Sequence, residues 1–459
     1  MPMAADPIPA QITAACAAVR PATPADAIGG VQPAIVAAPA STSEASTLLR
    51  AADDLALAVV FRGTGSRLHW GNPPARCDLV VETTGLDEVV EHAAGDLVAS
   101  VQAGVRLDQL AEVLAAAGQR LALDPPTRPP ACLSGAGGQE AGGQGAGRGT
   151  VGGVLATGAA GPLRLRYGTG RDLLIGITVV RADGAIARSG GKVVKNVAGY
   201  DLGKLFAGSL GTLGLITQAT FRLHPLPART AYVSAACATP ADVGRLLAAA
   251  LESASSPVGA EIHWAAGDEP VLACVALEGA PASIGERART LARLLGSDAV
   301  LGSDAAASVR AEPPAWWGAG PAAEPGGTVL RIGFWPGDLA WVLGELRGAA
   351  KSAGVDPATG GPAAAGVLYA ALPGDQDPAA VAAFVTALRE ALGRSGQARS
   401  HPDGGPPART SVVVQHAPPA VGRLVDLFGP VPSLALMRAV KAQFDPGRRL
   451  APGRFAGGI

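Results

Sequence analysis

The chain has 459 residues, a formal net charge of -1 and only 16% charged residues. Its length suggests two or three domains, and its 48% hydrophobic content supplies enough apolar material for sizeable cores. The balanced charge without a basic stripe, together with 4% aromatic residues, argues against nucleic acid as a partner.

The cysteines are few and widely spaced: Cys16, Cys77, Cys132, Cys237 and Cys274. Because no Cys-x-x-Cys pair occurs, the sequence predicts neither a zinc ribbon nor an iron–sulfur cluster, and no metal site is expected. This usage fits a reduced, cytoplasmic compartment. The N-terminus lacks the pattern of a secretory signal, and no run of about 18 apolar residues predicts a membrane span.

The first half of the chain predicts short alternating elements. Residues 1–30 are rich in Pro and Ala with little periodicity, so we expect a poorly ordered segment. Hydrophobic patterns predict strands over 33–39, 57–63, 77–85, 96–105 and 215–227, with a hairpin over 172–190 that turns at Asp183-Gly184. Helices are expected over 43–55, 86–93 and 106–118. The Gly-rich, low-complexity segment 131–149 predicts a flexible insertion.

The second half has a different texture, with strands and long helices in alternation from about residue 229. Strands are expected over 230–238, 258–264, 270–279, 328–335, 366–374 and 410–416, and helices over 241–253, 283–295, 338–354 and 378–393. This rhythm predicts an antiparallel sheet backed by helices. A last short helix and a Pro/Gly-punctuated tail end the chain.

Three glycine-bearing turns in the first half each follow an apolar strand. They are FRGTGS at 61–66, GTVGGVLATGAAG at 149–161, and GSLGTLGLIT at 208–217. Small residues leave backbone N–H groups accessible, and such groups can hold an anion. None of the turns fits the Rossmann fingerprint or the P-loop, so those two nucleotide sites are not expected.

The order of these turns carries a resemblance. RGTGS, then GTVGGVLATGAAG with RYGTGRDLL, then GYDL-x-KLFAGSLGTLGLIT resemble the vanillyl-alcohol oxidase (PCMH-type) FAD-binding family over roughly residues 33 to 227. LDPPT at 123–127, the stretch from Lys192 to Pro227 and the terminal FDPGRRLAPGRF are similar to the FAD-binding (E) subunits of bacterial glycolate oxidases.

The resemblance implies an α+β fold in four parts. These are the lead-in 1–30, a PCMH-type FAD-binding domain of two α+β subdomains at 31–228, an α+β cap domain with an antiparallel sheet at 229–430, and a helix and tail at 431–459 that return to the FAD domain.

The resemblance also implies roles for individual residues. Arg62 to Ser66 would wrap the FAD pyrophosphate with backbone N–H groups, and Gly208 would let the chain pass close to the cofactor. The full set of implied FAD-binding residues is Arg62, Gly63, Thr64, Gly65, Ser66, Asp124, Pro125, Gly152, Gly153, Thr157, Gly158, Tyr167, Gly168, Asp172, Gly211, Gly214 and Ile216.

The catalytic residues stay unknown. Catalytic hydroxyacid dehydrogenases of this superfamily carry a histidine-rich segment in their second half, whereas His263, His401 and His416 stand in isolated contexts here. His69 is a candidate for covalent flavin attachment, and we favour a plain loop histidine and therefore non-covalent FAD. Cys132 is an unlikely attachment point because it lies in the insertion.

A few other side chains have two interpretations each. Lys192, Lys195 and Lys204 are either solvated or part of a docking surface, and the solvated interpretation is favoured. Tyr200 is expected to pack against the flavin edge rather than to donate to a substrate. The pair Trp316-Trp317 fits a partner contact and a buried position equally well.

Three functions follow from the resemblance. The favoured one is an FAD-binding subunit of a glycolate (2-hydroxyacid) oxidase complex, which relays electrons from a catalytic FAD subunit to an iron–sulfur subunit. The chain would then be cytoplasmic, or peripheral to a membrane through its partners. The alternatives are a stand-alone FAD-linked oxidoreductase of a small alcohol or 2-hydroxyacid, and a non-catalytic assembly subunit.

Overall fold

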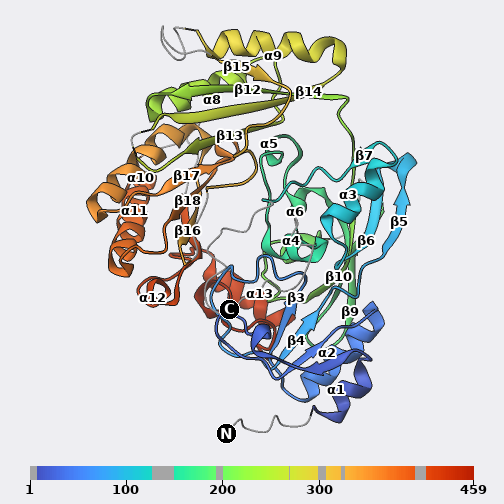
Figure 1. Ribbon diagram of the computed structural model, residues 1–459. Helices are drawn as coiled ribbons and strands as arrows, with labels where there is room; N and C mark the ends of the chain where they lie inside the picture. Colours follow the sequence, from blue (N-terminus) through green and yellow to red (C-terminus); the bar gives the residue numbers. More distant parts are fainter. Residues whose placement is uncertain are drawn as a thin grey trace.

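The computed structural model describes residues 8–126, 149–192, 200–267, 269–297, 307–321, 326–398 and 410–459. Figure 1 shows two parts stacked on each other: small sheets from the first half of the chain below, and one large sheet with its helices above. The C-terminal helix α13 (Leu434–Phe444) lies with the lower part, so the chain ends beside the elements with which it began.

The N-terminal sheet has four short strands in the order β1-β2-β4-β3. Their bounds are β1 (Val19–Pro21), β2 (Ile35–Ala37), β4 (Leu79–Glu82) and β3 (Val59–Arg62). Strands β2, β4 and β3 run parallel, whereas β1 is antiparallel to β2. Helix α2 (Thr42–Asp54) starts where the Ser41 hydroxyl accepts the Glu44 N–H, and it buries Leu48 and Leu49 in the core of this sheet.

The lead-in does not follow the sequence expectation. Residues 1–7 lie outside the described residues, but helix α1 (Ala10–Ala15), strand β1 and the 3₁₀ turn η1 (Pro24–Asp26) are ordered. The expectation of a poorly ordered segment is therefore wrong for these elements. Ile12 and Cys16 anchor α1 in the core of the N-terminal sheet, a tertiary contact that local periodicity does not reveal.

A second sheet of five antiparallel strands follows in the order β5-β6-β10-β8-β9. Its strands are β5 (Val89–Ala93), β6 (Val98–Gln102), β10 (Leu215–Arg222), β8 (Leu174–Val180) and β9 (Ile186–Gly190). The β8–β9 hairpin turns at Asp183-Gly184 as predicted. The helix expected over 86–93 is wrong, because the β-branched Val89 and Val90 favour a strand that pairs with β6.

Short helices connect these sheets. They are α3 (Leu107–Ala115), α4 (Val151–Thr157), α5 (Arg164–Tyr167), α6 (Gly170–Leu173) and α7 (Gly203–Phe206), with the 3₁₀ turn η2 (Ala94–Asp96) and the two-stranded β7 (Gln119–Arg120) and β11 (His224–Pro225). The second glycine-bearing segment is therefore a helix rather than a turn, because Thr150 caps α4 and Gly158 ends it in a left-handed conformation.

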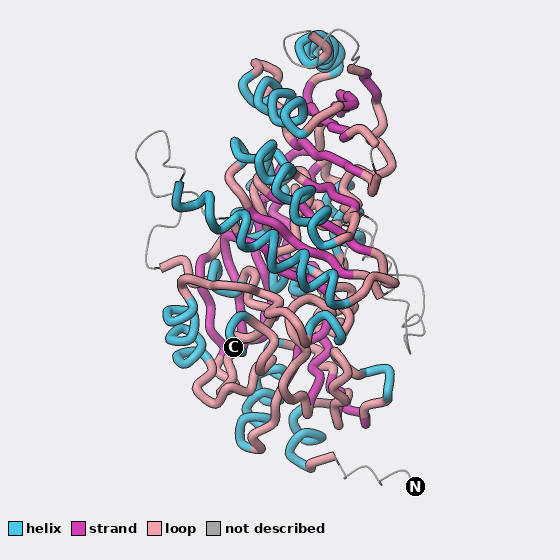
Figure 2. The backbone as a smooth tube through the Cα atoms, turned by 90° about the vertical axis from the view of Figure 1, so that its left-hand side faces the viewer, coloured by secondary structure: helices cyan, strands magenta, loops and turns pink. Residues whose placement is uncertain are grey.

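The large sheet has eight strands, and every pair of neighbours runs antiparallel. In spatial order they are β15 (Ser308–Arg310), β12 (Arg229–Cys237), β14 (Val271–Gly279), β13 (Gly259–Trp264), β17 (Ala358–Gly361), β18 (Val367–Leu372), β16 (Thr328–Gly333) and β19 (Ser411–His416). Helices α8 (Pro240–Glu252), α9 (Pro281–Leu295), α10 (Leu339–Ala353) and α11 (Pro378–Ala398) cover one face (Figure 2). The opposite face, called the free face below, turns toward the first half of the chain.

Two 3₁₀ turns, η4 (Pro336–Asp338) and η5 (Ala363–Ala365), lie within the large-sheet half. The C-terminal segment comprises α12 (Pro419–Gly422), α13 and the turn η6 (Ala456–Gly458). Leu450 forms a parallel bridge with Val59 of β3, and the Lys441 ammonium donates to the carbonyls of Thr212 and Leu450. The tail thereby joins the N-terminal sheet to the third glycine-bearing segment.

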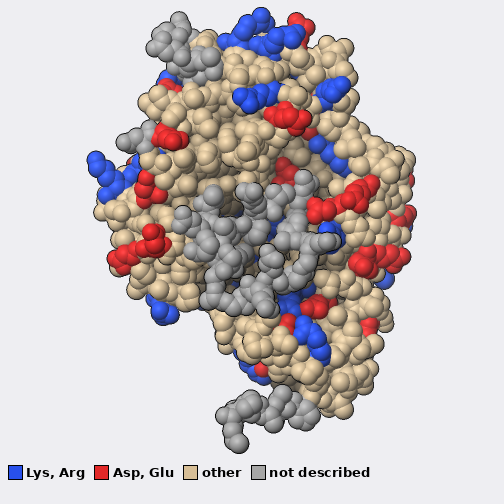
Figure 3. Space-filling view, viewed as in Figure 1, with Lys and Arg blue, Asp and Glu red and all other residues tan. Residues whose placement is uncertain are grey.

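The described helices include none that is long and apolar enough to cross a membrane. On the face shown in Figure 3, acidic and basic side chains both occur, and among the described residues neither sign forms a continuous stripe.

Candidate functional site

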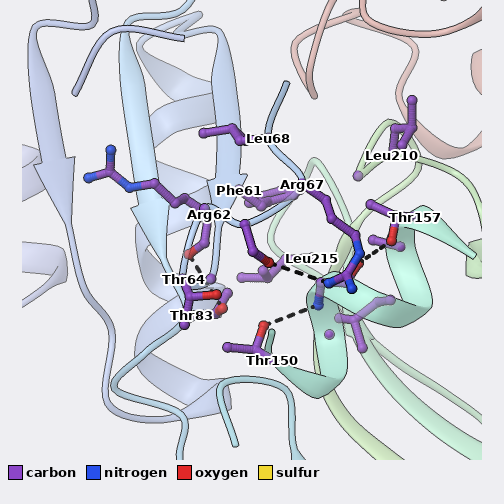
Figure 4. Close-up of a pocket in the computed structure, with 18 of the residues that line it drawn as sticks. Phe61, Arg62, Thr64, Arg67, Leu68, Thr83, Thr150, Thr157, Leu210 and Leu215 are labelled. Atoms are coloured by element: carbon purple, nitrogen blue, oxygen red, sulfur yellow. Dashed lines mark hydrogen bonds between the residues drawn. The ribbon is translucent and has the colours of Figure 1, made fainter. Parts of the chain in front are cut away.

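A pocket opens where the first turn, helix α4 and the third glycine-bearing segment converge (Figure 4). It holds about 720 Å³ of space, part of it open to solvent, which is a common size for a cofactor or ligand site. The described residues that line it are Phe61, Arg62, Gly63, Thr64, Gly65, Ser66, Arg67, Leu68, Thr83, Thr150, Gly152, Gly153, Ala156, Thr157, Leu210, Gly211, Gly214, Leu215, Ile216 and Arg454.

The first turn presents backbone donors to this pocket. The N–H groups of Thr64, Gly65 and Ser66 donate to no acceptor among the described residues. Gly65 has a left-handed φ of 76°, and no atom lies within 4 Å of the place where a Cβ would stand. Consecutive N–H groups in such a turn form a concave site that suits an anion.

Helix α4 contributes two glycines with different roles. A Cβ on Gly152 would stand 2.7 Å from the Ala103 Cβ, so Gly152 allows the helix to pack against the chain that follows β6. A Cβ on Gly153 would meet only the Thr150 hydroxyl, at 3.1 Å, and would otherwise point into open space. Gly152 therefore serves packing, whereas Gly153 leaves room for a ligand.

The third segment closes the floor of the pocket. Gly211 has a φ of 76°, and a Cβ there would stand 3.1 Å from the Phe61 ring. A Cβ on Gly214 would stand 3.0 Å from the Val180 carbonyl oxygen. The glycines of this segment thus permit close approach of neighbouring backbone and rings, and Ile216 of β10 follows them along the pocket wall.

The charges that line the pocket are positive, since its described lining contains arginines and no carboxylate. The Arg62 side chain points away from α4, toward Asp26 and Glu82, with N–O distances of 2.6 and 2.5 Å (Figure 4). Arg67 instead reaches toward α4. Burial lowers the pKa of Arg67 to about 10.

Arg454 is the most enclosed of these cations, with 4% of its surface exposed. Its guanidinium donates to the carbonyls of Leu68 and Trp70 at 2.6 and 2.8 Å, while its buried Nε has no partner among the described residues. Burial lowers the pKa of Arg454 to about 10, which still leaves it charged at neutral pH. A buried cation without a counter-ion favours an anionic ligand.

The structure brings a large part of the predicted FAD-binding residues together around this pocket. These are Arg62, Gly63, Thr64, Gly65, Ser66, Gly152, Gly153, Thr157, Gly211, Gly214 and Ile216. The remaining predicted residues lie outside its lining: Asp124, Pro125, Gly158, Tyr167, Gly168 and Asp172.

Three of the outlying residues have evident structural contacts. The Asp124 carboxylate accepts the N–H groups of Gly161 and Leu163. Asp172 caps α6 through Thr169. The Tyr167 hydroxyl donates to Glu278 of the large sheet at 2.7 Å. Their assignment to the cofactor stays a prediction.

Sequence reasoning missed several lining residues, namely Phe61, Arg67, Leu68, Thr83, Thr150, Ala156, Leu210, Leu215 and Arg454. The sequence could have identified Thr150, because threonine is a preferred N-cap residue directly before a helix. Arg454 stands in the terminal FDPGRRLAPGRF motif, which supported the family resemblance without suggesting a role for any of its residues.

Two histidines meet where the first turn approaches the free face. The rings of His69 and His416 are 5.1 Å apart in an edge-on arrangement, and the buried Nε2 of His69 has no partner among the described residues. Burial, with His416 and Arg67 adding to it, lowers the pKa of His69 to about 3. Burial also lowers the pKa of His416, so both rings are neutral at pH 7.

The other ambiguous side chains divide between surface and interior. Lys192 pairs with Glu91 and Lys204 with Asp201, all four at the surface, whereas Lys195, Cys132 and His401 lie outside the described residues. Tyr200 is 91% exposed on the protein itself, and its packing against the flavin edge stays a prediction.

The two tryptophans pack on the free face of the large sheet. Trp316 stacks on His263 with ring centroids 5.6 Å apart, and Trp317 meets Tyr232 edge-on at 5.4 Å. Both tryptophans are half-buried, so the two interpretations of this pair stay open.

Comparison with known proteins finds similarity within the first half of the chain. Residues 33–149 and 144–190 match the family described as "FAD binding domain". The chain is 38% identical over 191 residues to the D-lactate dehydrogenase of Archaeoglobus fulgidus, which covers 42% of this chain and 39% of that protein. It is 34% identical over 169 residues to glycolate oxidase subunit GlcE of Escherichia coli, which covers 37% and 43% of the two chains. The matched region thus spans about two fifths of the length of these curated relatives.

A solved structure extends the likeness to the whole fold. The chain superposes on p-cresol methylhydroxylase with bound substrate at a TM-score of 0.68, over 97% of this chain and 95% of that one, with 14% sequence identity. The PCMH-type fold predicted from the sequence is therefore confirmed, including its antiparallel second half.

The pocket fits the diphosphate of FAD. Free N–H groups at Thr64 to Ser66, the open space at Gly65 and Gly153, and the buried cation Arg454 all belong to the lining of one cavity. Main-chain donors and a buried cation are the groups that a dianionic diphosphate requires.

Proposed function

From the FAD binding domain that residues 33–190 form, we propose that this chain holds FAD non-covalently and serves the oxidation of a small 2-hydroxyacid such as glycolate. The observation that carries the proposal is the pocket, in which three free N–H groups and the buried Arg454 face one cavity without a carboxylate among its described lining. Bound FAD would supply the acceptor for the electron pair that leaves the alcohol carbon.

The residues of this chain would bind and orient the cofactor. Thr64, Gly65 and Ser66 would donate to the diphosphate oxygens, and Arg454 would balance their charge. Gly153 would leave the clearance that the diphosphate needs.

The role within a larger assembly rests on the relatives. Likeness to a glycolate oxidase subunit supports a cytoplasmic FAD subunit that works beside a catalytic FAD subunit and an iron–sulfur subunit. Likeness to a D-lactate dehydrogenase supports the alternative, a self-sufficient oxidoreductase. An assembly subunit without FAD is disfavoured, because the pocket retains its donors and its clearance.

One preparation separates these functions. The chain is expressed alone, its visible spectrum is recorded, and glycolate and then D-lactate are added without oxygen. We expect a yellow protein whose colour neither acid bleaches, as a relay subunit requires. Bleaching would favour the self-sufficient enzyme, and a colourless protein that FAD cannot reconstitute would refute both flavin functions.

A further inference from the structure

A short exposed connection joins the first half of the chain to the large sheet. Strand β11 ends at Pro225, β12 begins at Arg229, and both residues are exposed, as is Leu226 between them. The Leu226 N–H donates to the Gly118 carbonyl at 2.8 Å. Domains joined by such a connection move relative to each other unless contacts between their surfaces prevent it. The contacts beside the connection therefore decide how the two halves are held.

Three side chains meet across the two halves beside this connection, and they are called the junction triad below. Arg120 of β7 and Tyr167 at the end of α5 belong to the first half, whereas Glu278 lies near the end of β14 in the large sheet (Figure 1). The Glu278 carboxylate accepts from the Arg120 guanidinium at 2.6 Å and from the Tyr167 hydroxyl at 2.7 Å. The Arg120 guanidinium also donates to the Tyr167 oxygen at 3.0 Å. These hydrogen bonds close a triangle across the junction.

The junction triad is largely enclosed and adjoins the strand that leads into the connection. Arg120 is the direct cross-strand partner of His224 on β11, and the Tyr167 ring meets the His224 ring edge-on at 4.7 Å. Leu277 belongs to the core under the helices, so Glu278 next to it points to the free face. The Arg120 and Glu278 side chains are 17% and 9% exposed. Charge-assisted hydrogen bonds are stronger in such an enclosed place than at the surface.

The protonation states suit this arrangement at neutral pH. Burial, with the hydrogen bond and charge of Glu278 adding to it, raises the pKa of the Tyr167 hydroxyl, so the hydroxyl keeps the proton that it donates. Arginine stays charged in proteins and donates through a planar fork. The Glu278 carboxylate therefore has two donors from the first half, and turning the large sheet against the first half would break both hydrogen bonds.

A second contact between the halves lies at the other side of the large sheet. His416 of β19 meets His69 edge-on at 5.1 Å, and Phe428, which follows β19, meets Phe455 of the tail at 5.2 Å. Strands β13, β17, β18 and β16 separate β19 from β14, the strand that carries Glu278. Neighbouring strands lie about 4.8 Å apart, so the two contacts are roughly 20 Å from each other. Two separated contacts fix an orientation, whereas one alone permits a pivot.

We infer that Arg120, Tyr167 and Glu278 fix the orientation of the large sheet relative to the first half, and that the Tyr167 hydroxyl serves this junction rather than the cofactor. Without the junction triad, the large sheet would pivot about the contact at His416. The described lining of the FAD pocket comes from the first half and the tail, so FAD binding would persist. The inference goes beyond the proposed function and does not depend on it.

The test measures the distance between two spin labels, one in each half of the full chain, by double electron–electron resonance. Glu112→Cys on α3 and Thr290→Cys on α9 supply exposed attachment sites. Cys132→Ser is included in the labelled parent protein, because the four described cysteines are buried and Cys132 is the fifth in the sequence. The FAD dissociation constant of each protein is measured by quenching of flavin fluorescence.

We expect a narrow distance distribution in the labelled parent protein and roughly twice that width in both Tyr167→Phe and Glu278→Met, because the hinge is then released. The FAD dissociation constant of Tyr167→Phe should equal that of the parent. The matched control is Tyr232→Phe, which removes the hydroxyl of a half-buried tyrosine on the free face and should keep the narrow distribution.

Each contrary result has a separate meaning. A distribution as narrow in Tyr167→Phe and Glu278→Met as in the parent overturns the inference. Loss of FAD in a folded Tyr167→Phe protein also overturns it, since the hydroxyl would then serve the cofactor. A parent protein that cannot take up FAD refutes the proposed function, and the label distances still decide the inference. Thermal melting identifies any variant that fails to fold, and Tyr167→Phe, which loses a single oxygen atom, decides the matter if Glu278→Met does not fold.

Discussion

At the scale of single residues, two buried ionisable side chains, Arg454 and Glu261, lead to testable predictions. Arg454 lines the cofactor pocket and has two carbonyl partners but no carboxylate. Glu261 of β13 is 3% exposed, and the Gly318 N–H donates to it at 2.6 Å. Arg454 is charged at neutral pH, whereas burial favours the neutral form of Glu261. A substitution of similar size tests the role of each side chain.

Removing the Arg454 charge should weaken FAD. Arg454→Met retains much of the buried stem but loses the cation, so we expect the dissociation constant for FAD to rise about 10- to 100-fold, in line with the worth of one charge-assisted hydrogen bond. Titration with quenching of flavin fluorescence measures it. Arg438→Met, an exposed change on α13, is the control. Equal FAD affinity in Arg454→Met and wild type would show that this cation does not face the cofactor.

Because of Glu261, the free energy of unfolding should fall as the pH rises. Burial, with the Asp124 charge adding to it, raises the pKa of Glu261 from 4.5 to about 8. Between these pH values the folded chain keeps a proton on Glu261 that the unfolded chain releases. The stabilising contribution of Glu261 is therefore complete below pH 4.5 and is lost as the pH rises toward 8. The free energy of unfolding falls by about 1.4 kcal/mol per pH unit in this range.

Glu261→Gln keeps the acceptor for Gly318 and removes the titration. Its free energy of unfolding in urea should therefore exceed that of the wild type by more at pH 8 than at pH 5. Glu286→Gln, exposed on α9, should show no such trend. The same difference between variant and wild type at both pH values would contradict a raised pKa at Glu261.

At the scale of elements, hydrophobic patterning located most strands and helices, and local chemistry explains the misses. Strand β5 was expected as a helix because its short pattern is ambiguous, and pairing with β6 decides it. Helix α4 was expected as a turn because its glycines are poor helix formers, yet the Thr150 cap and packing against Ala103 hold it.

The C-terminal element depends on a buried ion pair that the sequence did not reveal. Lys441 of α13 is 4% exposed and donates to Asp445 at 2.6 Å, while Asp445 is fully buried. The same ammonium donates to the Thr212 carbonyl in the third glycine-bearing segment and to the Leu450 carbonyl in the tail. This one side chain therefore ties the tail that carries Arg454 to the pocket floor.

Lys441→Met should destabilise the chain by about 3–5 kcal/mol, because Asp445 would be left as a buried charge without its ammonium partner. Urea unfolding gives the free energy, and an FAD titration should show weaker binding as the tail loosens. Lys351→Met, exposed at the end of α10, should change stability by less than about 0.5 kcal/mol. If Lys441→Met lowers the free energy of unfolding as little as the control does, Lys441 does not tie the tail to the pocket floor.

At the scale of the whole molecule, the sequence predicted two halves but not the surfaces that join them. The Arg120 guanidinium and the Tyr167 hydroxyl both meet Glu278, at 2.6 and 2.7 Å, across 158 and 111 positions of the chain. Arg454 meets Leu68 across 386 positions. Periodicity and motifs act over a few residues, so they identified the glycine-rich side of the pocket and missed Arg454, the buried cation that a distant segment supplies.

We propose that the cavity between the first turn and α4 holds the FAD diphosphate, and Gly153→Val tests this assignment most directly. The new side chain would project into the open space of the pocket, because a Cβ on Gly153 would meet only the Thr150 hydroxyl there. The measurement is the FAD dissociation constant of wild type and variant, with thermal melting to confirm that both are folded. We expect a folded Gly153→Val protein that no longer retains FAD, and a folded variant with wild-type FAD affinity would contradict the account.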